Sequence, residues 1–179
     1  NAGNSIAAVG ATNAGAFNTL VGDEAGTAIT TADYNTAIGK GAGTAIATGT
    51  GKNVAVGSLA LAVSNTGAEN VAIGHQALGS DEKGNRSVAV GFGALYTQDF
   101  DSGTSVYNVA VGHSAGQAVT DGIKNTLIGG LAGDSITGGQ ENTALGYGTL
   151  IDNQTGNYCV AVGGFSLGNS TVSNNTAVG

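Results

Sequence analysis

The two histidines are the first candidates for chemistry, because an imidazole can bind a metal or titrate near neutral pH. His75 and His113 follow glycines at equivalent places in a repeated segment, and Phe92 occupies the same place between them. If the repeats stack at the strand spacing of about 4.8 Å, the two histidine backbones lie roughly 9–10 Å apart. One shared metal would then need further ligands. We interpret His75, Phe92, His113 and Tyr147 as a variable, exposed column, with metal binding or pH sensing as the alternative.

The remaining groups that suit catalysis lack partners in the sequence. Cys159 replaces an asparagine of the repeat and has no histidine near it in sequence. The segment GKGAG at 39–43 resembles a phosphate-binding loop but lacks the Gly-Lys-Ser/Thr ending and a following helix. The acidic residues form neither an acid/base pair nor a calcium loop. We therefore expect no enzyme, no cofactor and no metal.

One irregular loop gathers aromatic and acidic residues. Residues 96–107 extend one repeat by four residues, giving a step of 21 where 17 is the usual step. Loops that bulge from a rigid scaffold are favoured binding sites, and aromatic rings beside carboxylates suit sugars. The alternative is a loop packed onto the scaffold. The candidate ligand-binding residues are Tyr96, Asp99, Phe100, Asp101 and Tyr107.

All these residues are positioned by a repeated pentad of the form NVAIG, as at 70–74. The ten copies are separated by 17, 18, 17, 17, 21, 17, 17, 17 and 16 residues. A unit of this length cannot bury its own apolar face, so it must stack on its neighbours as a solenoid. The copies begin at Asn18, Asn35, Asn53, Asn70, Ser87, Asn108, Asn125, Asn142, Cys159 and Asn175.

Each pentad position has its own rule. The fifth is always glycine, which predicts positive φ or a close backbone approach. The second is Thr or Val, the third is mostly Ala and the fourth is a large aliphatic residue. Strand alternation puts positions two and four on one face and position three on the other. Since neither face is charged, we expect both to be covered, with Val71 and Ile73 on a buried side. This burial also disfavours a lattice-binding solenoid, which needs an exposed file of threonines.

The asparagines at position one have two interpretations: amides bonded along the stack, or residues that tolerate a strained turn. The residue before the pentad varies in a way that predicts stacking in register. Charges of alternating sign would meet there if equivalent residues are about 4.8 Å apart, and they would fix the register more than the stability. This register ladder comprises Lys52, Glu69, Arg86, Lys124 and Glu141.

The remainder of each unit contains a second apolar position and then a polar segment that leads to the next pentad. We call this polar segment the return. Four residues after the glycine, Leu61, Leu78 and equivalent leucines recur, with glycine in the other copies. We interpret this position as a second short strand or a corner. The residues that follow are polar and rich in turn formers, and we expect them to be exposed.

Composition excludes several classes of partner. The formal net charge is −7, from 12 acidic and 5 basic residues, so the basic surface that nucleic-acid binding requires is missing. No apolar run approaches the roughly 18 residues of a membrane helix. The chain begins and ends inside the repeat pattern, so it looks like a piece of a longer polypeptide. Because each unit supplies few large apolar side chains, a second buried surface is needed, which favours a homo-oligomer.

The pentads at 53–57 and 70–74 resemble those of trimeric autotransporter adhesin heads. The fuller unit NTALGYGTL at 142–150 resembles repeats of phage tail-fibre-like and bacterial surface-fibre proteins. The resemblance covers residues 18–179 and implies a left-handed β-roll wound by three chains. Adhesin-head repeats are usually shorter, so the return here is longer. Attachment and trimerisation devices would lie outside this chain.

These observations predict an all-β parallel β-solenoid (β-roll) of about ten 17-residue coils, intertwined or side by side in a homotrimer. An irregular first coil would span 1–17 and the repeat solenoid 18–179. The expected function is a structural and adhesive segment of an extracellular, cell-surface or virion fibre that contacts a surface glycan or a protein receptor. The alternative is a structural filament subunit or spacer that recognises nothing.

Overall fold

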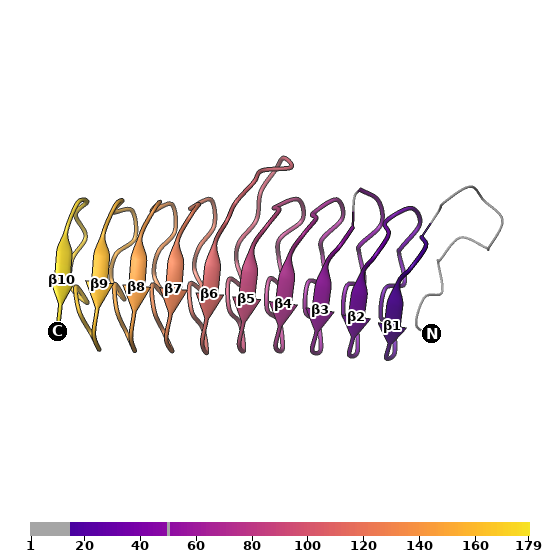
Figure 1. Ribbon diagram of the computed structural model, residues 1–179, viewed down its shortest axis with the longest axis horizontal. Helices are drawn as coiled ribbons and strands as arrows, with labels where there is room; N and C mark the ends of the chain where they lie inside the picture. The colour runs from indigo at the N-terminus through magenta and orange to yellow at the C-terminus, as the bar shows by residue number, and fades with distance from the viewer. Residues whose placement is uncertain (1–14, 50) are drawn as a thin grey trace.

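The computed structural model describes residues 15–49 and 51–179, which form an all-β parallel solenoid (Figure 1). Each coil contributes one strand of three residues, and the strands form a single sheet in chain order. The described residues contain no helix, and so none that could cross a membrane. The strands are β1 (Thr19–Val21), β2 (Thr36–Ile38), β3 (Val54–Val56), β4 (Val71–Ile73), β5 (Val88–Val90), β6 (Val109–Val111), β7 (Thr126–Ile128), β8 (Thr143–Leu145), β9 (Val160–Val162) and β10 (Thr176–Val178).

The strands pair in the register that the pentads predict. Ala55 pairs with Ala72 and Ala72 with Ala89, so equivalent positions meet from coil to coil. The 21-residue step keeps this register, since Ala89 pairs with Ala110 across the longer loop. The prediction of a parallel β-solenoid is confirmed, with about nine turns of about 17 residues. The predicted irregular first coil falls largely on residues 1–14, outside the described part of the chain.

The interior of the coil is lined by the small residue of the pentad. Ala72 is fully buried, whereas Val71 on the same strand is half-buried and Ile73 is 39% exposed. The other strands repeat this arrangement, with position three more buried than its two neighbours. The expectation that Val71 and Ile73 share a buried side is therefore wrong for this chain. Alternation was predicted correctly, but it is position three, alanine in eight copies and leucine at Leu20 and Leu127, that faces the interior, while the large aliphatic side chains of position four face outward.

Glycine at position five lets successive coils approach each other closely. Gly57 has φ of +132°, and a Cβ built there would lie 2.6 Å from the carbonyl oxygen of Gly74. No side chain fits at that distance, and the same close approach recurs at nine of the ten pentad glycines, whereas Gly179 shares only the positive φ. The predicted positive φ and close approach at this position are both confirmed.

The second apolar position is a corner and not a second strand. Leu61 is fully buried there, in a turn with φ of +50°, and Leu78 repeats this at φ of +48°. In other coils a glycine takes the corner, as at Gly43, and Ile46 three residues later fills the same space. A Cβ built at Gly43 would lie 2.8 Å from Ile46 Cδ1. The core thus takes a large side chain in this region of the coil from either of two places, and Leu20 and Leu127 at position three add a second one in their coils.

Whether leucine or glycine takes the corner correlates with the polarity of the residue three positions later. Where glycine takes the corner, the residue three positions later is a buried aliphatic one, namely Ile29, Ile46, Val119 or Ile136. Where leucine takes the corner, that residue is polar. The polar residues of this position are Ser64, Asp81, Gln98 and Asn153, all fully or almost fully buried, and Ser170. We call this set the polar seam.

Candidate functional site

A ladder of buried asparagines runs beside the sheet at position one. Asn125 Nδ2 donates to the carbonyl oxygen of Gly139, 2.8 Å away, and its Oδ1 accepts from the backbone N–H of Asn142 at 3.0 Å. The same two bonds recur at Asn53 and Asn70. Of the two interpretations of these asparagines, amide bonding along the stack is the one observed. Positive φ belongs instead to the residue before each asparagine.

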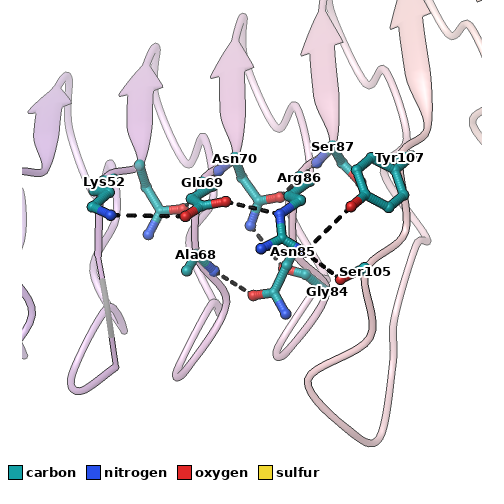
Figure 2. Close-up of polar contacts among 11 residues, drawn as sticks. Lys52, Ala68, Glu69, Asn70, Gly84, Asn85, Arg86, Ser87, Ser105 and Tyr107 are labelled. Carbon is teal, nitrogen blue, oxygen red and sulfur yellow. Dashed lines mark hydrogen bonds and ion pairs between the residues drawn. The ribbon is translucent and has the colours of Figure 1, made fainter.

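The register ladder lies on that preceding residue, and its charges meet in the central coils (Figure 2). Arg86 Nε donates to Glu69 Oε2 at 2.8 Å, and Lys52 Nζ lies 3.8 Å from Glu69 Oε1. Tyr107 continues the row, with its ring centroid 5.7 Å from the Arg86 guanidinium carbon. These residues have φ near +60°, as in Glu69 at +62°. All are exposed, so each pair contributes little free energy.

The same row continues at both ends of the described solenoid. Lys124 Nζ donates to Glu141 Oε1 at 3.1 Å. Phe17 and Tyr34 stack with ring centroids 5.0 Å apart and planes 9° apart. The structure thus brings the five residues of the register ladder together as one group of three and one pair.

The exposed column forms a stack of rings. The centroids of His75 and Phe92 are 5.3 Å apart, and those of Phe92 and His113 are 5.1 Å apart, with interplanar angles of 10° and 9°. Because both faces of Phe92 are covered by imidazoles, only its edge is open to a ligand. Tyr147 is separate from this stack and meets Phe165 edge-on, with centroids 5.3 Å apart.

The surroundings of this column do not form a metal centre. In residues 15–49 and 51–179, no three His, Cys, Asp or Glu side chains are close enough to hold an ion. Asp134 is the acidic residue of this region whose pKa responds to His113. Partial burial raises the pKa of Asp134 above its usual value, and the nearby His113 offsets part of that rise.

The insertion does not gather its aromatic residues into one site. Phe100 is only 8% exposed, whereas Asp99 and Asp101 are exposed. The ring of Tyr96 lies against Gly79 of the preceding coil, and Tyr107 belongs to the row of Arg86. Figure 1 shows the loop between β5 and β6 rising beyond the other returns. At Phe100 the loop is packed, as the alternative interpretation expected.

The outward face of the sheet is a continuous apolar surface. Its side chains come from positions two and four of every strand, and none of them is charged. Eight of its large aliphatic residues are more than a third exposed, from Val111 at 36% to Val178 at 77%, and the others, such as Val56 and Val71, are half-buried. We call this surface the strand face. It is uncharged, regular and without a covering layer in the single chain.

The polar seam was not foreseen from the sequence, where its residues belong to a return expected to be exposed. Gln98 is fully buried, Asp81 is 1% exposed, and Gln98 Nε2 donates to Asp81 Oδ2 at 2.5 Å. Burial is the largest cause that raises the pKa of Asp81, against lowering by the hydrogen bonds from Gln98 and Gly84. The signal in the sequence is the leucine three residues before each seam residue.

Comparison with known proteins adds no relative to this picture. No family model, no curated protein and no solved structure matches the chain.

Proposed function

We propose that this chain is a structural and adhesive segment of an extracellular fibre, and that copies of it associate through the strand face into a homo-oligomer, with the trimer favoured. The observation that carries the proposal is the strand face. A parallel sheet is ordinarily covered on both faces, and here only the coil interior covers one of them.

The size and chemistry of the strand face fit another copy of the same chain. Two outward residues on each of ten strands give twenty side chains, close to the roughly 20–30 residues a side of a standard interface. Identical copies aligned in the same direction would place Val against Val and Thr against Thr, so no charge is buried. The resemblance to fibre proteins made from three chains points to the same assembly.

Light scattering coupled to size separation tests the association. We expect a single species with a multiple of the monomer mass, three being favoured. Ile73→Glu with Val111→Glu should dissociate it, because charge would enter the centre of the contact. Thr66→Glu, on an exposed return, is the control and should leave the mass unchanged. A monodisperse monomer would overturn the proposed oligomer. If that monomer also showed thermal hysteresis of ice growth, the strand face would be a surface that binds a crystal lattice.

The adhesive role is tested separately, at the insertion. Deleting residues 99–102 restores a 17-residue step and removes Asp99, Phe100 and Asp101 without touching the strand face. We expect this variant to assemble normally and to lose binding on arrays of glycans and surface proteins. If the intact protein binds nothing on such arrays, the chain is a spacer, which is the second candidate because the stacked rings and packed Phe100 leave few open ring faces.

A further inference from the structure

Asp81 is a buried carboxyl group on which two hydrogen-bond donors converge. Its Oδ1 accepts from the backbone N–H of Gly84 at 2.8 Å, and its Oδ2 accepts from Gln98 Nε2 at 2.5 Å. An ionised carboxylate can accept both bonds, since neither of its oxygens carries a proton. Asp81 belongs neither to the asparagine ladder, nor to the register ladder, nor to the strand face.

A second coil shows what an uncharged residue does at the same place. Asn153 Oδ1 accepts from the backbone N–H of Gly156 at 2.7 Å, which repeats the bond from Gly84 to Asp81. Its Nδ2 faces an acceptor, Cys159 Sγ, at 3.6 Å. The turn itself is therefore satisfied by an amide. The carboxylate of Asp81 is required only by the second donor, Gln98.

Gln98 links Asp81 to the insertion and has a fixed orientation. Its Nε2 also donates to Ser87 Oγ at 3.0 Å, while its Oε1 accepts from Asn108 Nδ2 at 2.8 Å. Gln98 lies within the extended loop at 96–107, directly before residues 99–102. Turning the amide over would set Nε2 against the Nδ2 donor of Asn108, so the ionised state of Asp81 holds one arrangement.

The insertion is anchored to the turn that carries Asp81. The backbone N–H of Asn85 donates to the carbonyl oxygen of Thr104 at 2.9 Å, and Asn85 forms a parallel bridge with Ser105. Lys83 Nζ donates to the carbonyl oxygen of Asp101 at 3.1 Å. The hydrogen bond between Asp81 and Gln98 is the buried member of this set.

Protonation of Asp81 disturbs this arrangement at Oδ2. A neutral carboxyl group can still accept the backbone N–H of Gly84, but its O–H needs an acceptor, and Gln98 Nε2 presents a donor to Oδ2. Ser64 Oγ, one coil earlier in the seam, is buried without a hydrogen-bond partner. The other groups that act on Asp81 are the carboxylate of Asp99, which raises its pKa, and the backbone N–H of Lys83, which lowers it.

We propose that Asp81 and Gln98 form a proton-operated switch at the base of the insertion. Above the transition, the carboxylate holds the Gln98 amide in the observed orientation and ties the insertion to the turn at 81–85. Below it, protonated Asp81 forces the amide to turn over and the insertion to loosen. This is a device beyond the proposed function and does not depend on oligomer formation.

Nuclear magnetic resonance of the labelled protein between about pH 3 and pH 8 tests the switch. The carboxyl carbon of Asp81 should titrate above its ordinary pKa. The Gln98 side-chain amide and the backbone amides of Thr104 and Ser105 should shift in the same step. The proposal is overturned if Asp81 titrates while Gln98 and the insertion do not respond, or if Asp81 titrates at or below its ordinary value.

Two variants and one control sharpen the result. Asp81→Asn should abolish the step in the insertion. Gln98→Leu should also abolish it and should raise the pKa of Asp81 further, because a lowering hydrogen bond is lost. Asp134→Asn, which removes another carboxyl of raised pKa outside the seam, should leave the step intact. Persistence of the step in Gln98→Leu would overturn the switch even if Asp81→Asn failed to fold.

The raised pKa of Asp81 also predicts how the free energy of unfolding depends on pH. The folded-state pKa of Asp81 is raised, so its contribution to stability is fully present below the ordinary value of 3.8 and is lost as pH rises through the folded-state pKa. The free energy of unfolding should decrease with pH across that window in the native chain. Asp81→Asn should flatten this dependence, and an unchanged slope would contradict the assignment to Asp81.

Discussion

Asparagine at the first pentad position satisfies two backbone groups that would otherwise be buried without partners. Its amide nitrogen closes the return of its own coil, and its oxygen accepts from the next coil. Serine and cysteine replace it at Ser87 and Cys159, where a seam residue lies alongside. At this scale the solenoid is held by side chains that bridge consecutive coils, with the charges of the register ladder on the surface.

The asparagine ladder predicts that removing one of its side-chain amides lowers the free energy of unfolding substantially. Asn125→Ala should lower the free energy of unfolding by about 2–4 kcal/mol, because the carbonyl of Gly139 and the N–H of Asn142 each lose a partner at about 1–3 kcal/mol. Chemical denaturation measures the change. Asn65→Ala, at an exposed return position, is the control and should change stability by less than about 0.5 kcal/mol. Equal losses in the two variants would show that the ladder is not stabilising.

The register ladder predicts a small, salt-dependent effect. Glu69→Lys should lower the free energy of unfolding by up to about 1 kcal/mol, because the introduced ammonium group repels both Lys52 and Arg86. Replacing Lys52 and Arg86 by Glu in the same chain should restore part of the loss. A double-mutant cycle at low and high salt measures the coupling. Absence of any coupling at low salt would mean that these side chains do not interact in solution.

At the scale of the element, each coil is one strand, one close glycine contact and one corner. The two kinds of corner, leucine followed by a polar residue or glycine followed by an aliphatic one, occupy the same interior volume. Gly43 with Ile46 and Leu61 with Ser64 are neighbouring examples of the two kinds. The packing of the core therefore depends on the pair and not on either residue alone.

This pairing predicts strong coupling between the two positions. Gly43→Leu alone should cost about 1–3 kcal/mol by overpacking against Ile46, and Ile46→Ala alone about 2–5 kcal/mol by leaving a cavity. The double variant should be more stable than the sum of the two effects predicts, because leucine refills the space. Thermal and chemical denaturation of all four chains test this. Simple additivity would contradict a shared volume.

These elements show how far the sequence leads. The pentads predict the strand, its register and its close glycine contact, because each depends on a property of one position. They do not tell which strand face is inside, since Val71 and Ile73 are more apolar than Ala72 and both faces of the strand are uncharged. The burial of Asp81 and Gln98 is not evident from these residues themselves, because both lie in polar segments, and the one signal is the leucine three residues before each of them.

At the scale of the whole molecule, the strands of the described coils contact only the strands of neighbouring coils, so the solenoid behaves as a linear array. The register is maintained through steps of 16, 17, 18 and 21 residues, since differences in length are absorbed in the returns. The strands are the part that cannot shift, because a slip of one residue exchanges the two faces. The array should consequently accept the loss of a whole coil but not a change inside a strand.

Deleting residues 52–68 tests this property of the array, because it removes one complete unit of 17 residues and keeps Glu69 beside Arg86. The variant should fold with all remaining strands in register and be shorter by one strand spacing, about 4.8 Å, in small-angle X-ray scattering. The matched control deletes residues 55–70, one residue fewer, and joins Val54 directly to Val71 within the strand. Val71 would then point into the narrow interior and Ala72 outward, so this variant should fail to fold or aggregate. If both deletions fold equally well, the alternation of faces along the strand does not determine how the coils stack.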